Sequence, residues 1–258
     1  MTKLSIIIPA YNEEKRIKNT LYEYCRYFAK KGIEFEIVVV LNACKDDTSK
    51  IVRQCQKQFK EIKLLDFEKG GKGFAIIEGF KDALKRRNDL IGFIDADMAT
   101  CPKAFWDLIE SIRKHDGVIA SRWIKGSVVK TKQTLSRRFA SRIFNLIVRS
   151  LFFFQHRDTQ CGAKLFKRNT LEKIVPYLKL TEWAFDVNLL YLCKKEGLRV
   201  KEIPTIWEDK SDSKISNVPK TSLQMFLGVL RLRGINSPFV RTQIFFRPLI
   251  GLAWRLIK

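Results

Sequence analysis

The sequence lacks the patterns that mark several common protein classes. Its six cysteines include no CxxC pair, so neither a zinc site nor a disulfide framework is indicated, and we expect reduced thiols. No stretch reaches the roughly 18 uninterrupted apolar residues of a membrane-spanning helix. The N-terminus has only a short apolar run without a small-residue cleavage site, so we expect no signal peptide. These absences predict a protein on the cytoplasmic side of any membrane that it touches.

Acidic residues are nearly absent from two stretches, and the net charge of +22 is concentrated there. Residues 122–157 contain nine Lys or Arg and no acid, and residues 210–258 contain nine against one Asp. Both stretches are also apolar, as in "RRFASRIFNLIVRSLFFF". Basic and apolar residues at helical spacing are typical of helices in a membrane interface beside anionic lipids. Nucleic-acid binding or a solvated basic face would explain the charge alone, but the aromatic residues favour a membrane.

The composition allows a large core, because 46% of the 258 residues are hydrophobic. Short Val- and Ile-rich segments, typical of strands buried on both faces of a parallel sheet, occur at 4–10, 35–41, 62–67, 90–96 and 117–121. Helical patterns occur at 13–31, 47–59, 73–87, 102–114 and 185–196. This alternation predicts an α/β, Rossmann-like domain with a mostly parallel sheet flanked by helices over residues 1–210. Residues 211–258 are expected to form a basic amphipathic, membrane-associating segment.

Polar residues follow three of the predicted strands at their carboxyl ends, where sheets of this kind bind ligands. They are Tyr11 to Glu13, Asn42 to Asp47, and the pair Asp95 and Asp97. Two carboxylates separated by one residue at a strand end suit a hard divalent cation that is shared with substrate phosphates. Strand-end carboxylates are common, so the pair indicates a metal site only together with other features.

The glycine-rich stretch "KGGKGFA" at 69–75 differs from the phosphate-binding loop of kinases, because no GK[ST] follows at the required spacing. Its glycines and Lys72 open a predicted helix, which favours a close backbone approach to phosphate or sugar. A simple turn would also account for the glycines.

Several segments, taken together, resemble one enzyme family. In chain order they read "SIIIPAYNEEKRI", "VVVLNACKDDT", "KGGKGFAIIEGF", "IDADMAT", "GVIASR", "RDTQCGAKLFKR", "WAFDVNLLY" and "KEIPTIW". In this order and spacing the chain is similar to the family 2 glycosyltransferases with a GT-A fold, from about residue 3 to 230. "DTQCGAKLF" and "WAFDVNLL" most resemble the polyprenyl-phosphate sugar transferases, especially the dolichyl-phosphate glucosyltransferase branch.

The resemblance implies a hexosyltransferase that uses a nucleotide sugar, with inversion at the anomeric carbon and with Mg²⁺ or Mn²⁺ as cofactor. The implied acceptor is a polyprenyl (dolichyl-type) phosphate at a membrane surface with anionic lipids, and no nucleic acid is involved. "DADMAT" is close to the glucosyl branch, which favours UDP-glucose as the donor. The alternatives are a GDP-mannose-dependent mannosyltransferase and a family 2 transferase that acts on a polysaccharide or glycerolipid hydroxyl.

The resemblance also implies roles for individual residues. The residues implied in nucleotide-sugar binding are Pro9, Tyr11, Glu13, Asn42, Asp46, Lys72 and Asp95. The implied metal ligands are Asp97 and Asp95. The implied catalytic residues are Asp158, Asp97 and Arg122, and Arg122 is placed to meet a phosphate. The residues implied on the sugar and acceptor side are Gln160, Trp183 and Asp186.

Two positions depart from the family pattern. The loop that usually reads Asp-Asp-Gly-Ser is Leu41-Asn42-Ala43-Cys44 here, so a carboxylate that contacts the base is lost or replaced by an amide, and the nucleobase stays open. The glutamine that can add a metal ligand in the mannosyl branch is Ala99. The acceptor classes also differ in chemistry: a hydroxyl would need Asp186 or Asp158 as general base, whereas a phosphate is already anionic.

Overall fold

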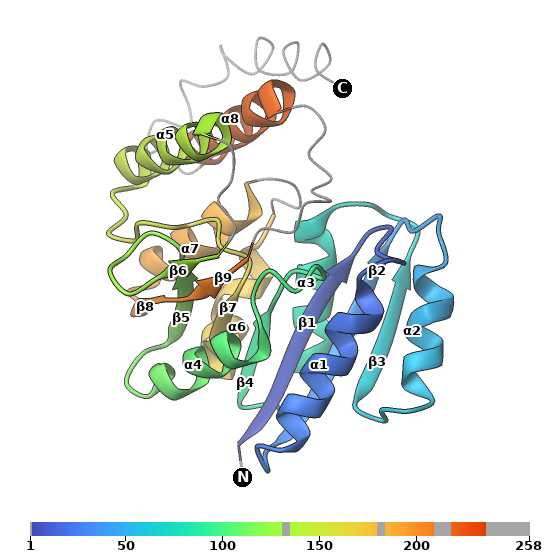
Figure 1. Cartoon of the computed structure of the whole chain (residues 1–258). Helices are drawn as coiled ribbons and strands as arrows, with labels where there is room; N and C mark the ends of the chain where they lie inside the picture. The colour runs from blue at the N-terminus through green and yellow to red at the C-terminus, as the bar shows by residue number, and fades with distance from the viewer. Residues whose placement is uncertain (1, 131–134, 180–183, 209–217, 236–258) are drawn as a thin grey trace.

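The computed structural model describes residues 2–130, 135–179, 184–208 and 218–235. Its strands are β1 (Lys3–Ala10), β2 (Glu34–Asn42), β3 (Ile62–Phe67), β4 (Leu90–Phe93), β5 (Gly117–Ser121), β6 (Val128–Val129), β7 (Lys164–Lys167), β8 (Val200–Pro204) and β9 (Ile206–Trp207). Seven of them form one sheet in the order β3-β2-β1-β4-β7-β5-β8, and β6 pairs with β9 in a small second sheet (Figure 1). The five predicted strands are confirmed, although β4 ends at Phe93, before the two aspartates.

The pairing is mostly parallel, as the sequence predicts. β1 lies parallel to both β2 and β4, β3 is parallel to β2, and β8 is parallel to β5. The exception is β7, which lies antiparallel between β4 and β5. This strand was not predicted, because its four residues, KLFK, carry a lysine at each end and do not form an apolar run.

Helices cover both faces of the large sheet (Figure 1). They are α1 (Ile17–Ala29), α2 (Thr48–Gln56), α3 (Lys72–Leu84), α4 (Pro102–Ile112), α6 (Arg168–Ile174), the short 3-10 helix η1 (Val175–Tyr177) and α7 (Phe185–Lys195). Because side chains alternate along a strand, Ile6 and Ile8 of β1 join a core cluster with α1 and α4, whereas Ile7 joins a second cluster with α3 and α7. This alternation explains why the strands of a sheet covered on both faces are apolar throughout.

The basic stretch before the DTQCG motif forms α5 (Leu135–Phe152), which lies beside α8 (Val218–Ile235) above the sheet (Figure 1). Val148 of α5 and Val229 of α8 are buried in a third apolar cluster. The sequence suggested that the three consecutive phenylalanines at 152–154 face a membrane, but two of them are not at the surface. Phe152 and Phe154 are buried with their rings stacked at 5.7 Å, whereas Phe153 is 74% exposed.

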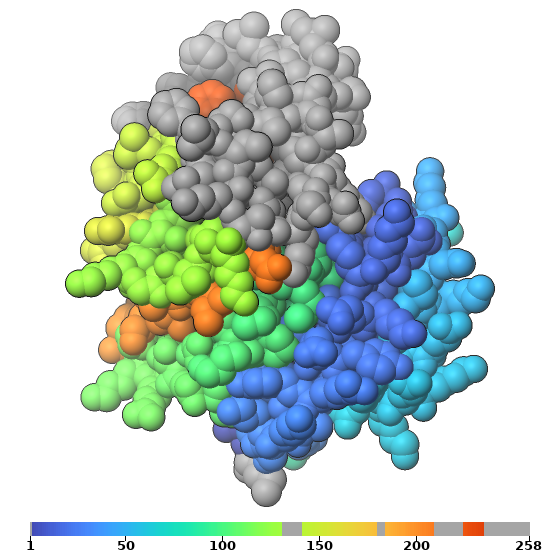
Figure 2. All heavy atoms as spheres, in the orientation of Figure 1, coloured from blue at the N-terminus to red at the C-terminus, as the bar shows by residue number. Residues whose placement is uncertain are grey.

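The C-terminal segment predicted at 211–258 lies outside the described residues except for α8. None of the helices that the structure describes is long and apolar enough to cross a membrane. Figure 2 shows β9, in orange, at the molecular surface next to the green and yellow-green residues that precede α5. Here Val128, Val129 and Ile206 of the small sheet are exposed.

Candidate active site

The loops after β1, β2 and β4 each contain a non-glycine residue with left-handed backbone: Asn12 (φ 53°), Ala43 (φ 58°) and Met98 (φ 61°). This conformation costs an L-residue about 1–2 kcal/mol, and such residues cluster at functional sites. All three lie in the segments in which the sequence predicted a ligand crevice. Ala43 also stands where the family pattern has glycine, the residue that adopts this conformation without strain.

Asp95, which follows β4, is held on two sides. Lys72, the first residue of α3, forms an ion pair with its carboxylate. On the other side lies Gly162, where a Cβ atom would come within 1.9 Å of Asp95 Oδ2, so only glycine leaves room for this carboxylate. Burial pushes the pKa of Asp95 upward, but the positive charge of Lys72 and its hydrogen bond more than offset this and lower the pKa. Asp95 is therefore ionised.

Asp97 has a different environment. Its Oδ1 accepts a hydrogen bond of 3.0 Å from the backbone N–H of Ala99, and it forms no salt bridge with any other residue that the structure describes. Burial, followed by the negative charge of Asp95, raises the pKa of Asp97. A divalent cation between the two carboxylates would offset this repulsion, so the pair fits Mg²⁺ or Mn²⁺. Within the described ranges no third His, Cys, Asp or Glu gathers with them, so further ligands would come from diphosphate and water.

Arg122 and Asp158 form a closed pair. Arg122 follows β5, and its Nε and Nη2 donate to the two Asp158 oxygens at 2.7 and 2.9 Å, while its backbone N–H donates at 3.0 Å. Asp158 is completely buried. Burial raises its pKa, but the charge and hydrogen bonds of Arg122 outweigh burial and lower it. The sequence placed Arg122 at a phosphate and Asp158 at the sugar; the structure shows that the guanidinium fork binds Asp158 within the protein.

Two further side chains fix the loop that carries Asp158. Glu202 of β8 accepts a hydrogen bond of 2.7 Å from the Asp158 backbone N–H. Asn145 of α5 accepts from the backbone N–H and the hydroxyl of Thr159 at 3.1 and 3.0 Å. The adjoining Gln160 donates its backbone N–H to Asp158 at 3.3 Å, and its side-chain Nε2 has no hydrogen-bond partner among the described residues. The loop is thus held by residues of β8 and α5 and by Arg122, which follows β5. The Gln160 side-chain amide donates to no described residue.

Lys164 is a site residue that the sequence analysis missed. It is the first residue of β7 and is completely buried, and its Nζ donates to Asp186 Oδ1 at 2.5 Å and to the Cys161 carbonyl at 2.7 Å. A buried lysine requires such partners. The signal was present in the sequence, because "DTQCGAKLF" places a single lysine among apolar residues directly after a polar motif.

Asp186, near the start of α7, joins this charged group. Besides pairing with Lys164, Asp186 affects the pKa of Lys72 through its negative charge. Burial lowers the pKa of Lys72, but the negative charges of Asp95 and then Asp186 raise this pKa above its ordinary value. The positive charge of Lys164 in turn lowers the pKa of Asp158. Four aspartates and three cations, which lie in or next to α3, β4, β5, β7 and α7, are therefore linked by ion pairs and by longer-range charge interactions, and we call this group the acidic crevice.

The residues predicted on the nucleotide side divide into exposed and internal ones. Tyr11 is 47% exposed, whereas Pro9 is buried within β1. Glu13 is nearly buried and binds the Arg16 guanidinium through two hydrogen bonds of 2.7 and 2.8 Å. Among these three, the most exposed side chain at the end of β1 is therefore Tyr11.

Asn42 and Asp46 support the neighbouring loops. Asn42 is buried; its amide donates to the Ala10 carbonyl at 2.9 Å and accepts from the Gly71 N–H at 3.1 Å, which ties β1 to the glycine turn. Asp46 accepts from the backbone N–H of Thr48 at the start of α2 and from the N–H of Glu14, both at 3.1 Å. The remaining prediction, Trp183, lies outside the described residues.

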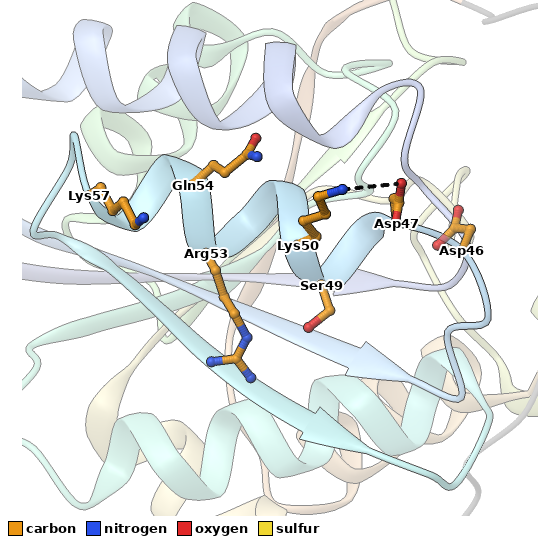
Figure 3. A pocket seen from close by; sticks show the side chains of 7 residues that line it. All are labelled: Asp46, Asp47, Ser49, Lys50, Arg53, Gln54 and Lys57. Carbon is orange, nitrogen blue, oxygen red and sulfur yellow. Dashed lines mark ion pairs between the residues drawn. The ribbon is translucent and has the colours of Figure 1, made fainter.

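A surface hollow of about 510 Å³ lies along α2 and is lined by Asp46, Asp47, Ser49, Lys50, Arg53, Gln54 and Lys57. Lys50 points toward Asp47, whereas Arg53 and Gln54 point to opposite sides of the helix (Figure 3). These side chains do not converge on one point (Figure 3).

Comparison with known proteins identifies the family to which this chain belongs. Residues 5–175 match the sequence model of Glycosyl transferase family 2, a span that includes Asp95, Asp97, Arg122, Asp158 and Lys164. The chain belongs to this family. As a family 2 glycosyltransferase it is 32% identical to the dolichyl-phosphate beta-glucosyltransferase of Dictyostelium discoideum, over 98% of this chain and 76% of that protein. It is also 32% identical to the Saccharomyces cerevisiae protein of the same name, over 83% of this chain and 69% of that protein.

Solved structures confirm the predicted GT-A fold of this family 2 glycosyltransferase. Glucosyl-3-phosphoglycerate synthase from Mycobacterium tuberculosis, crystallised with Mn²⁺, UDP and glucosyl-3-phosphoglycerate, superposes with a TM-score of 0.69 over 92% of this chain and 82% of that one, at 15% identity. The same enzyme was crystallised with Mg²⁺ and UDP, with a TM-score of 0.67. That enzyme was thus crystallised with a divalent cation and UDP together.

Proposed function

We propose that this glycosyltransferase moves glucose from UDP-glucose to the phosphate of a dolichyl-type polyprenyl lipid, at the cytoplasmic face of a membrane. The curated relatives named dolichyl-phosphate beta-glucosyltransferase support the sugar and the acceptor. The UDP found in solved structures of the same fold supports a uridine nucleotide. On this proposal residues 1–210 form the catalytic domain and residues 211–258 associate with the membrane.

The ion pairing of the carboxylates is the main observation that supports a phosphate acceptor. Asp95, Asp158 and Asp186 each form an ion pair, with Lys72, Arg122 and Lys164 respectively. A hydroxyl acceptor needs a general base to take its proton. Asp158 and Asp186 are held by largely buried cations. Asp95 and Asp97 would hold the divalent cation, so all four carboxylates would be poor bases. A phosphate monoester arrives ionised and needs only to be positioned. The crevice therefore favours a phosphate as nucleophile.

The reaction does not require a protein side chain to remove a proton from the acceptor. A phosphate oxygen of the acceptor forms a bond to the anomeric carbon from the face opposite the diphosphate, whose bond to that carbon breaks, so the configuration inverts. Asp95 and Asp97 would hold Mg²⁺ or Mn²⁺, which when bound offsets the charge on the diphosphate. Lys72 lies beside them, at the helix end that favours anions. Arg122 has further N–H donors that Asp158 does not use, and on this proposal they bind a phosphate.

α5 supports the membrane assignment. Ile143, Leu146 and, directly after the helix, Phe153 are exposed by 43%, 61% and 74%, and Arg142 is exposed on the same helix. Apolar and basic side chains on one surface helix suit an interface with anionic lipids. The buried Asn145 of this helix bonds to Thr159, next to Asp158. A lipid held at α5 would thus present its phosphate close to the crevice.

The test is an activity assay with a panel of substrates. Purified protein with Mg²⁺ or Mn²⁺ is incubated with a short polyprenyl phosphate and, in separate reactions, UDP-glucose, other UDP-sugars and GDP-mannose, and mass spectrometry identifies the products. We expect glucosylated polyprenyl phosphate from UDP-glucose. A polyprenol without phosphate serves as the matched acceptor; glycosylation of it at an equal rate would contradict the phosphate acceptor, and faster reaction with GDP-mannose would contradict the donor.

A further inference from the structure

The two lysines in the acidic crevice differ in how they are held. Lys164 is completely buried, with hydrogen bonds to Asp186 and to the Cys161 carbonyl and the Phe93 ring 5.3 Å from its Nζ. The Lys72 side chain is 41% exposed, and the one salt bridge it forms with a described residue is to Asp95, whose own side chain is 34% exposed. Lys164 is thus a fixed part of the interior, whereas Lys72 is at the surface of the crevice and can exchange its partner.

The charges in the crevice make this difference important. The Arg122–Asp158 and Lys164–Asp186 pairs are internally neutral, and Lys72 neutralises Asp95, so among these described residues Asp97 is the one without an ion-pair partner. A divalent cation at the two carboxylates would meet the positive charge of Lys72 at close range, and like charges at such distances repel strongly in a partly buried site. Either the cation binds weakly or Lys72 leaves Asp95.

Asp95 has less freedom to move than Lys72, because one side of it is closely packed. Its carboxylate lies against Gly162 so closely that even a Cβ atom there would overlap it. Lys72, by contrast, carries its charge on a flexible four-carbon chain and begins α3 after Gly70 and Gly71. The lysine is therefore the partner that can turn away, and an incoming diphosphate is the anion that would accept it.

We propose that Lys72 is an exchangeable counter-ion: it holds the place of the divalent cation at Asp95 in the empty crevice and transfers to the diphosphate when nucleotide and cation bind together. This deepens the proposed function, because it rests on a nucleotide-diphosphate donor and a divalent cation at this site. The consequence is cooperative binding. The cation alone binds weakly, the nucleotide strengthens it, and by linkage the cation strengthens nucleotide binding by the same factor.

The experiment measures binding, without turnover. Mn²⁺ affinity is determined by electron paramagnetic resonance of free Mn²⁺, with and without UDP, and in a second arm with GDP, for the wild type, Lys72→Met and the control Lys69→Met. Lys69 is an exposed lysine of the same loop whose Nζ lies over the Phe74 ring at 4.7 Å and does not pair with Asp95. The control removes the same charge close by. Thermal unfolding and a second variant, Lys72→Gln, check that the effect is not due to misfolding.

In the wild type and in Lys69→Met we expect the nucleotide to tighten Mn²⁺ binding by about ten-fold or more, within the usual range of coupling between sites. Lys72→Met should bind Mn²⁺ alone about ten-fold tighter than the wild type, and the nucleotide should add little further. Unchanged or weaker Mn²⁺ binding by Lys72→Met, an equal gain in Lys69→Met, or no Mn²⁺ binding by any protein would overturn the proposal. The binding experiment contains no acceptor, so its outcome does not depend on the activity assay. If the assay detects no glucosyl transfer, the Mn²⁺ affinities still test the role of Lys72.

Discussion

The Arg122 guanidinium and the Asp158 carboxylate face each other through two hydrogen bonds of 2.7 and 2.9 Å, and water does not reach the carboxylate. Arg122→Ala should therefore destabilise the whole fold, because it leaves a buried charge without its partner, a loss of about 3–5 kcal/mol. Urea unfolding of this variant measures the loss. Arg122→Ala combined with Asp158→Asn should recover part of it, and a single variant as stable as the wild type would contradict the structural role of the pair.

The same pair predicts how stability depends on pH. The folded-state pKa of Asp158 lies below its ordinary value of about 3.9, so between the two values the unfolded chain binds more protons than the folded one. The stabilising contribution is thus complete above pH about 3.9 and is lost as the pH falls through the folded-state pKa. Urea unfolding of the wild type and of an Arg122→Met/Asp158→Leu double variant, measured over this acid range, should show a steeper pH slope in the wild type. Equal slopes would contradict the lowered pKa.

Much of the fold could be predicted from local patterns. Segments such as 35–41 and 62–67 are continuous apolar runs, and the structure confirms them as strands with at most one residue added at either end. Proline at position 102 correctly marked the start of α4. Helix ends were less accurate: the helix predicted at 13–31 begins at Ile17, because Glu13 is used in the loop, where it bonds to Arg16.

The charge pairs in the crevice could not be predicted, because they join residues that are distant in the chain. Arg122 and Asp158 are 36 positions apart, and Lys164 and Asp186 are 22 positions apart. The sequence indicated that most of these residue types belong to one crevice, but which cation faces which carboxylate depends on β7, the antiparallel strand that it did not reveal. The roles of the phenylalanines depended in the same way on packing: α8 and α7 cover the side of α5 that holds Phe152.

Asp97→Asn should separate activity from stability. The variant is expected to lose about 10²-fold or more in turnover, because a preorganised charge beside the leaving group is removed. It should not lose stability, since Asp97 has no described salt-bridge partner and its charge is disfavoured by burial and by Asp95. Turnover with Mg²⁺ or Mn²⁺ and thermal unfolding measure the two effects. Wild-type activity of this variant in the presence of a chelator would rule out the metal assignment.

Gly162→Ala tests how closely Asp95 is held. A Cβ atom at position 162 would lie 1.9 Å from Asp95 Oδ2, so the carboxylate must shift, and we expect weaker Mn²⁺ binding and lower turnover. Gly70→Ala is the matched control, because its added methyl group would meet only the Ala43 Cβ at an ordinary 3.8 Å. Similar metal affinity in the two variants would show that Asp95 is not positioned by this contact.

The last prediction concerns α5 and the membrane. If the surface formed by Ile143, Leu146 and Phe153 enters the lipid interface, Leu146→Glu and Phe153→Glu should each reduce binding to vesicles that contain anionic lipids. The loss should persist at high salt, because buried apolar area is not screened, whereas the contribution of each basic residue, about 1 kcal/mol, weakens as salt rises. Arg142→Gln should therefore matter mainly at low salt.

Tyr177→Glu is the control for the vesicle experiment. Tyr177 is a 59% exposed aromatic residue in η1, away from α5 in sequence, so the same apolar-to-acid change there should leave vesicle binding close to that of the wild type. Co-sedimentation with vesicles at low and high salt measures all four variants. If Leu146→Glu and Phe153→Glu bind as well as Tyr177→Glu at both salt concentrations, then α5 is not the lipid-facing surface, and the acceptor must reach the crevice by another side of the protein.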